Sequence, residues 1–182
     1  MTHNSPRTVR TTSCVNVEEA LESVPRRVRD AAVESSRRMA VAGIRHALIG
    51  GLAVGAYGLH RTTGDVDFLI GEEGMIHHAG GVVTLRPEIP IAVGPIAIDF
   101  VGTEHEEALE QALDQPGSRL PVPVVPVEVL ILLKLRSNRM QDRTDIFRLV
   151  DEQGVDIDCI RKYLQRVSPA LVYTFEKIVD AL

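Results

Sequence analysis

Three aspartates carry the clearest chemical signal in this 182-residue chain. Asp65 and Asp67 are two residues apart in an alternating segment, and residues two apart on a strand project from the same face. Such neighbours repel each other unless a cation offsets their charge. Asp99 lies in a second apolar segment, 96–101, so it must either reach a cleft or be satisfied by a cation or an arginine. If the segments are neighbouring strands, the carboxylates converge and can hold two Mg²⁺ ions.

Two glycines precede these aspartates. Gly50 and Gly51 stand between the apolar segment 46–49 and the segment 52–59, which is rich in alanine and glycine. This order is typical of a strand followed by a helix. Glycines at such a junction let the backbone approach a bulky anion, and the helix start offers unpaired N–H groups to phosphate oxygens. A tight turn without a ligand explains the same pair.

The elements around these residues predict a small mixed sheet flanked by helices, an α/β (α+β) fold. We expect residues 1–125 to form a core with N-terminal helices, and residues 126–182 a C-terminal helical part packed on it as one compact unit. Strands are expected at 46–49, 65–71, 81–86 and 96–101, an extended edge segment at 121–126, and helices at 17–42 (divided by Pro25), 52–59, 104–113, 126–135, 142–153, 156–166 and 169–181.

Composition narrows the class of protein. The chain is 45% hydrophobic and 25% charged with a net charge of −5, which excludes a disordered chain and a coiled coil. The longest apolar run, Val127 to Leu133, contains Glu128 and is shorter than the roughly 18 residues that a membrane crossing needs. Residues 1–12 lack a signal-peptide core, and Cys14 and Cys159 are too few for a disulfide scaffold. We therefore expect a cytoplasmic protein without a membrane partner.

Basic residues form two groups in this acidic chain. The acidic total argues against nonspecific coating of nucleic acid, whereas local basic patches suit a nucleotide or an RNA end. Solvated helix faces explain either group equally well. The groups are Arg26, Arg27, Arg29, Arg37, Arg38 and Arg45, and then Lys134, Arg136, Arg139, Arg143 and Arg148.

The glycine pair and the aspartates together resemble a known signature. Gly50-Gly51, thirteen further residues, Asp65-Val66-Asp67 and a later Ile98-Asp99-Phe100 resemble the polymerase β-like nucleotidyltransferase superfamily. Arg61 and Thr63, placed just before Asp65, make the segment similar to the AbiEii-type nucleotidyltransferases of bacterial abortive-infection and toxin–antitoxin systems. The resemblance implies the nucleotidyltransferase fold. It also implies that the three aspartates hold Mg²⁺ and that Asp99 acts as, or positions, the base for an attacking hydroxyl.

A downstream block is similar to the second motif of the same group. It runs from Lys134 through Arg139 and Asp142 to Asp145, and departs once, at Gln141, where a basic residue is usual. With it, the resemblance covers about residues 46–149. The resemblance implies that Gly50 and Gly51 bind the triphosphate of an NTP and that Lys134 neutralises it. Arg61 and Thr63 would contact phosphate or support their loop.

Three further residues of that block have supporting roles. Asp142 and Asp145 are three apart on one helical face and either hold Arg139 or Lys134, take part directly, or form ordinary ion pairs. The histidines are weaker candidates. We expect His60 to be a bystander, and His77-His78 has no companion ligands in the sequence and is not expected to bind a metal.

The sequence thus predicts a Mg²⁺-dependent nucleotidyltransferase that moves a nucleoside monophosphate (NMP) from an NTP to an acceptor hydroxyl. The resemblance implies an RNA or tRNA 3′ end or a partner protein as acceptor, in a setting that includes an antitoxin protein. Two alternatives stay open. One is adenylylation of a small molecule, as in antibiotic-modifying enzymes, which a small acidic cleft would favour over one rimmed by arginines. The other is a catalytically silent nucleotide-binding module.

Overall fold

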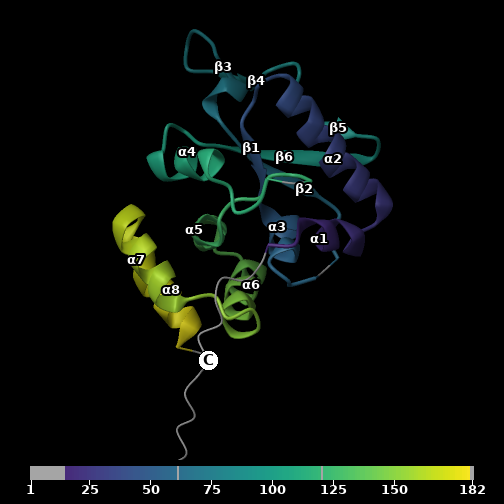
Figure 1. Ribbon diagram of the computed structural model, residues 1–182. Coiled ribbons are helices and arrows are strands. Elements are labelled where there is room, and N and C mark those ends of the chain that lie inside the picture. The colour runs from purple at the N-terminus through teal and green to yellow at the C-terminus, as the bar shows by residue number, and fades with distance from the viewer. Residues whose placement is uncertain (1–14, 61, 120, 181–182) are drawn as a thin grey trace, which may run out of the picture.

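A mixed four-stranded sheet forms the centre of the molecule (Figure 1). The computed structural model describes residues 15–60, 62–119 and 121–180, so Cys14 and Arg61 lie outside the described residues. The strands are β1 (His46–Leu48), β2 (Val66–Ile70), β3 (Met75–His77), β4 (Val83–Leu85), β5 (Ala92–Val93) and β6 (Ile96–Gly102). The sheet order is β1-β2-β6-β5, in which only β2 and β6 are parallel, and β3 and β4 form a separate hairpin.

Helices surround the sheet and continue beyond it. They are α1 (Val17–Ser23), α2 (Arg26–Val41), α3 (Gly50–Ala56), α4 (Glu107–Asp114), α5 (Val127–Ser137), α6 (Met140–Asp151), α7 (Ile157–Val167) and α8 (Val172–Val179), with 3-10 turns η1 (Glu72–Gly74) and η2 (Pro169–Leu171). α2 contacts all four strands of the sheet, whereas α5 contacts α3 and α4. Figure 1 shows α6, α7 and α8 at one end and the β3–β4 hairpin at the other. The α/β class with a C-terminal helical region is therefore confirmed, while the division at residue 125 stays a prediction.

Local signals in the sequence explain the helix boundaries. Asn16 accepts a hydrogen bond from the Glu19 N–H at 3.1 Å and caps α1, and Pro25 separates α1 from α2. Gly43, at φ +71°, follows the end of α2. None of the helices in the described ranges is both long and apolar enough to cross a membrane.

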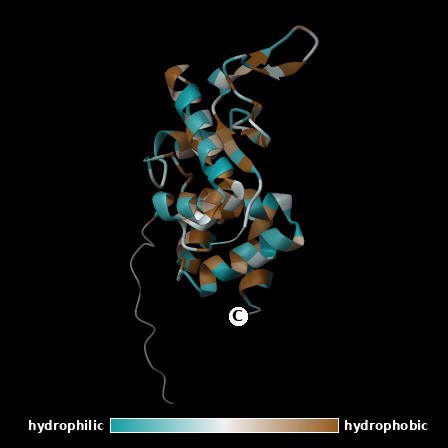
Figure 2. Ribbon diagram, turned by 90° about the vertical axis from the view of Figure 1, so that its right-hand side faces the viewer, coloured by the Kyte–Doolittle hydropathy of each residue, from teal (hydrophilic) through white to brown (hydrophobic). Residues whose placement is uncertain are grey.

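The two faces of β2 and β6 differ. Phe68 and Ile98 are buried on the face that α2 covers, where Ser36 of α2 hydrogen-bonds His46 at 2.7 Å. Strand alternation puts Asp67 and Asp99 on the other face. The β3–β4 hairpin projects from the body of the molecule and carries apolar residues, as Figure 2 shows.

Some predicted elements have different bounds, and two strands were not predicted. The helix expected at 52–59 begins earlier, at Gly50, and the helix expected at 169–181 starts as a 3-10 turn before α8. The short strands β3 and β5 gave no recognisable alternation in the sequence. The extended segment 121–126 lies beside β1, because the Leu48 N–H donates to the Pro123 carbonyl at 2.7 Å. The prediction that this segment forms an edge is wrong at Val124, whose N–H donates to the Ser118 carbonyl at 2.9 Å on the side away from β1.

Candidate active site

β2 and β6 bring the three aspartates together. The Cα atoms of Asp67 and Asp99 are direct partners in the parallel register, and adjacent strands lie about 4.8 Å apart. Asp65 stands just before β2, and its charge and that of Asp99 both act on Asp67. We call Asp65, Asp67 and Asp99 the acidic cluster. The expected convergence is present, and its metal-binding role stays a prediction.

The acidic cluster has an excess of negative charge. Burial, and then the charges of Asp99 and Asp65, raise the pKa of Asp67, although the charges of Arg139 and Lys134 act in the opposite direction. Within the described ranges, no Lys or Arg forms an ion pair with any of the three aspartates. The oxygen ligands of the cluster, and the lack of an ion-paired Lys or Arg among the described residues, fit a hard divalent cation such as Mg²⁺.

Gly50 lets Asp67 occupy its position. Its φ is +62°, and a Cβ built at Gly50 would lie 1.9 Å from Asp67 Oδ2. The neighbouring Ile49 N–H donates to the Asp67 carbonyl at 3.0 Å, which fixes the end of β1 against β2. The close approach of the Asp67 side chain therefore explains why this position needs a glycine. Phosphate binding by Gly50 and Gly51 stays a prediction.

Asp99 lies at an open sheet edge. β5 pairs only with Ile96 and Ala97, so the remainder of β6 has no strand on that side among the described residues. Asp99 is exposed and lines a groove of about 730 Å³, together with apolar side chains that include Met75 and Phe100. Of the two outcomes expected for this carboxylate, the structure shows access to a cleft. None of the described residues that line the groove is Lys or Arg.

Lys134 is buried and forms ion pairs with the carboxylates of Asp142 and Asp145. Its side chain is 5% exposed, and Nζ donates to Asp142 Oδ1 at 3.1 Å and to Asp145 Oδ2 at 2.7 Å. We call Lys134, Asp142 and Asp145 the paired cluster. Burial alone would raise the pKa of Asp142, but hydrogen bonds from Arg139, Ser137 and Lys134 lower it to about 2. The expected contact of these aspartates with Lys134 and Arg139 is therefore present.

Arg139 is the more accessible cation at this place. Its Nε donates to Asp142 Oδ2 at 2.9 Å, yet 77% of its side chain is exposed. The hydrogen bond to Asp142 raises the pKa of Arg139, and the negative charge of Asp67 adds a smaller effect in the same direction. Arg139 can therefore reach a phosphate group near the acidic cluster more readily than Lys134. The predicted contact of Lys134 with a triphosphate stays a prediction.

Residues before the acidic cluster support its loop. Thr63 is buried, and its hydroxyl donates to the Asp65 carbonyl at 3.4 Å, so its observed contact is with the loop backbone. Arg61, which we expected to act with Thr63, lies outside the described residues. His60 Nε2 lies 3.2 Å from Glu19 Oε1, and its expected bystander role stays a prediction.

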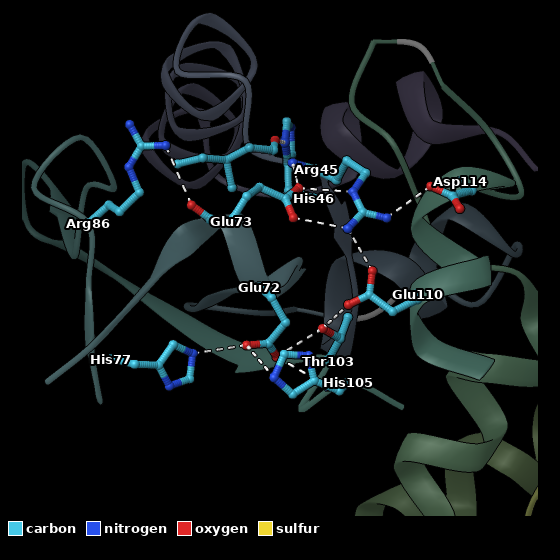
Figure 3. A network of polar contacts seen from close by, with 11 residues as sticks. Arg45, His46, Glu72, Glu73, His77, Arg86, Thr103, His105, Glu110 and Asp114 are labelled. Carbon is cyan, nitrogen blue, oxygen red and sulfur yellow. Dashed lines mark hydrogen bonds and ion pairs between the residues drawn. The ribbon is translucent and has the colours of Figure 1, made fainter. Parts of the chain in front are cut away.

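Most of the basic residues singled out in the sequence are paired with acids. Arg37 and Arg38 share Glu34 and lower its pKa to about 2. Arg45 contacts Glu73 and two carboxylates of α4 (Figure 3). These pairs leave less positive charge for an RNA surface on α2 than the sequence suggested.

No family model and no curated protein matches the chain, so the family resemblance rests on the motif residues alone. The structure also joins Glu72, His77 and His105, which the sequence did not group. These residues come from separate elements, and no spacing rule connects them.

Proposed function

We propose that the protein is a Mg²⁺-dependent nucleotidyltransferase of the polymerase β-like superfamily, similar to the AbiEii type. The observation that carries this proposal is the acidic cluster. Asp67 and Asp99 are direct partners on parallel strands, and the pKa of Asp67 is raised by burial and by both neighbouring aspartates. Such a cluster is suited to a cation that arrives with an anionic substrate.

Asp65, Asp67 and Asp99 would hold the Mg²⁺ ions. When bound, the ions supply positive charge to the triphosphate and to the charge that develops during transfer at phosphorus. The acceptor oxygen forms a bond to the α-phosphorus, the bond from that phosphorus to the β-phosphate bridging oxygen breaks, and pyrophosphate leaves. Asp99, which is exposed at the groove, accepts the proton of the acceptor hydroxyl.

The cations beside the cluster have different tasks in this proposal. Arg139 is exposed and its charge acts on Asp67, so it contacts the phosphates of the NTP. Lys134 is held by Asp142 and Asp145 and positions the junction of α5 and α6. Gly50, the first residue of α3, keeps space for the Asp67 carboxylate, and Gly51 follows it in the first turn of the helix.

The acceptor has two candidates. The family resemblance favours an RNA or tRNA 3′ end or a partner protein, in a toxin–antitoxin setting. The groove beside Asp99 favours a small molecule, because it carries Glu72 and Glu104 among apolar side chains and has no Lys or Arg lining in the described residues. RNA phosphates need cationic partners, whereas an apolar molecule with an amine suits this surface.

The test incubates the purified protein with each α-³²P-labelled NTP, Mg²⁺ and total cellular RNA or hydroxyl-bearing amines. Label on RNA, protein and small molecules is followed separately, together with pyrophosphate release. We expect transfer that falls more than about 100-fold in Asp65→Asn and is retained in Asp151→Asn, an exposed aspartate on α6. Transfer that survives Asp65→Asn, or no pyrophosphate release with any NTP and acceptor, would overturn the proposal.

A further inference from the structure

Figure 3 shows that Glu72, His77 and His105 meet, and all three residues line the groove. Glu72 belongs to η1, His77 ends β3, and His105 lies in the loop between β6 and α4. One side-chain ligand atom from each residue lies within 4.8 Å of the other two. The fold therefore supplies the companions that His77 lacks in the sequence.

Both imidazoles approach the same carboxylate oxygen. His77 Nε2 lies 3.3 Å and His105 Nε2 3.8 Å from Glu72 Oε2, and the rings are stacked at 6.3 Å with an interplanar angle of 18°. Ligand atoms of a tetrahedral zinc ion are roughly 3.3 Å apart, given bond lengths of about 2.0–2.1 Å. Because both histidines are exposed, their rings can close the remaining distance by side-chain rotation.

The other oxygen of Glu72 is held by the protein. Glu72 Oε1 accepts a hydrogen bond from the His105 N–H at 3.3 Å and lies 3.2 Å from the buried Thr103 hydroxyl, whose single hydrogen Glu72 and Glu110 share. Thr103 also contacts Glu110 of α4, which in turn pairs with Arg45 at 2.6 Å (Figure 3). These contacts orient the carboxylate with Oε2 toward the rings, as hydrogen bonds to the first ligands of a metal do.

Backbone strain lies at the same place. Glu104 and His105 have φ values of +50° and +60°, and neither is a glycine. Left-handed conformations are unfavourable for residues other than glycine and persist only where surrounding contacts determine them. Here the strained turn brings both the N–H and the ring of His105 to Glu72.

We propose that Glu72, His77 and His105 form a Zn²⁺ site. Two imidazole nitrogens and one carboxylate oxygen suit zinc, whereas Mg²⁺ prefers oxygen ligands alone, so this site and the acidic cluster select different ions. Zn²⁺ would tie the β3–β4 hairpin to the β6–α4 loop and leave one coordination position open toward the groove. The proposal does not depend on nucleotide transfer.

The test titrates Zn²⁺ into the metal-free full-length protein in competition with a chromophoric zinc chelator. We expect one equivalent whose affinity falls at least about tenfold in His77→Ala and in His105→Ala. His78→Ala is the matched control, because His78 is adjacent and exposed and bonds Thr84 instead, and it should bind as the wild type does.

Two further measurements keep the result interpretable. Circular dichroism shows whether each variant folds, and Glu72→Gln repeats the test without shortening the side chain. Asp67→Asn should keep the zinc equivalent, which separates this site from the acidic cluster. No Zn²⁺ binding by the wild type, or equal binding by the wild type, His77→Ala and His105→Ala, would overturn the proposal.

Discussion

The acidic cluster and the paired cluster each contain an aspartate whose pKa burial acts to raise, Asp67 and Asp142, yet the charges around these two carboxylates are balanced differently. Asp142 in the paired cluster accepts hydrogen bonds from Lys134 and Arg139, and its pKa falls to about 2. Asp67 in the acidic cluster has Asp65 and Asp99 as its charged neighbours on β2 and β6, and burial and these charges raise its pKa. Burial opposes ionisation in both places, so the neighbouring charges decide the direction.

This difference separates a structural from a functional use of the same residue type. The paired cluster contains its own cation and holds α5 against α6. In the acidic cluster, the described residues supply no ion-paired cation, and in the proposed function a cation from solution offsets part of the charge. Four substitutions can break or sharpen this comparison.

Removing the built-in cation should have the largest effect. Lys134→Met leaves two buried carboxylates without their Lys partner, and we expect the free energy of unfolding to fall by about 3–5 kcal/mol. Urea unfolding measures this loss. Lys162→Met on the exposed face of α7 is the control and should change the free energy by less than about 0.5 kcal/mol. Equal effects of the two changes would remove the distinction between the clusters.

The second largest loss of stability should come from filling the space that Gly50 leaves for the Asp67 side chain. Gly50→Ala adds a Cβ that conflicts with the Asp67 carboxylate at a φ of +62°, and we expect a loss of about 3 kcal/mol. Gly43→Ala is the matched control, since Gly43 has a φ of +71° but no atom within 4 Å of the added Cβ. It should cost only the backbone strain, about 1–2 kcal/mol. Thermal unfolding that shows the same loss for both would mean that Asp67 does not depend on Gly50.

The third effect is a pH dependence. The pKa of Asp142 is about 2 in the fold, below the ordinary value of 3.8 for an aspartate, so charged Asp142 stabilises the fold above about pH 4. This contribution, about 2 kcal/mol, is lost as the pH falls from about 4 to about 2. The difference in unfolding free energy between wild type and Asp142→Asn should therefore shrink over this range in urea titrations. A difference that is constant from pH 6 to pH 2 would contradict the ion pairs.

The smallest effect should be a gain in stability, whereas the three preceding substitutions should lower stability. The raised pKa of Asp67 means that its charged form destabilises the fold at neutral pH, and the stability of the wild type should rise as the pH falls toward that pKa. Asp67→Asn should raise the melting temperature by a few degrees in Mg²⁺-free buffer, and Asp151→Asn should leave it unchanged. A lower melting temperature of Asp67→Asn would show that the carboxylate has a stabilising partner.

Much of the site followed from local patterns. Alternation predicted the strands that carry Asp67 and Asp99, and the structure confirms both. Their direct pairing was conditional in the sequence, because about thirty residues with two unpredicted short strands separate them. The exposure of Asp99 depends on β5 being only two residues long, a length that gives no periodic signal.

The burial of Lys134 and the cluster of Glu72, His77 and His105 depend on long-range contacts, which the sequence patterns did not predict. Asn138, at φ +53°, ends α5 in the left-handed conformation, so that α6 returns beside it and Asp145 reaches Lys134. The sequence placed both residues in one motif but did not show that Lys134 is buried. The cluster of Glu72 and His105 with His77 needs three separate segments, and no pattern along the chain connects them.

The most direct test of the acidic cluster is the Mg²⁺ dependence of nucleotide binding, measured by isothermal titration calorimetry. ATP, CTP, GTP and UTP are each titrated into wild type and Asp67→Asn, in Mg²⁺ and in EDTA. We predict that at least one NTP binds the wild type in Mg²⁺, and that this binding is lost in EDTA and in Asp67→Asn. Binding that is equal in Mg²⁺ and EDTA, or no binding of any of these nucleotides, would contradict the account.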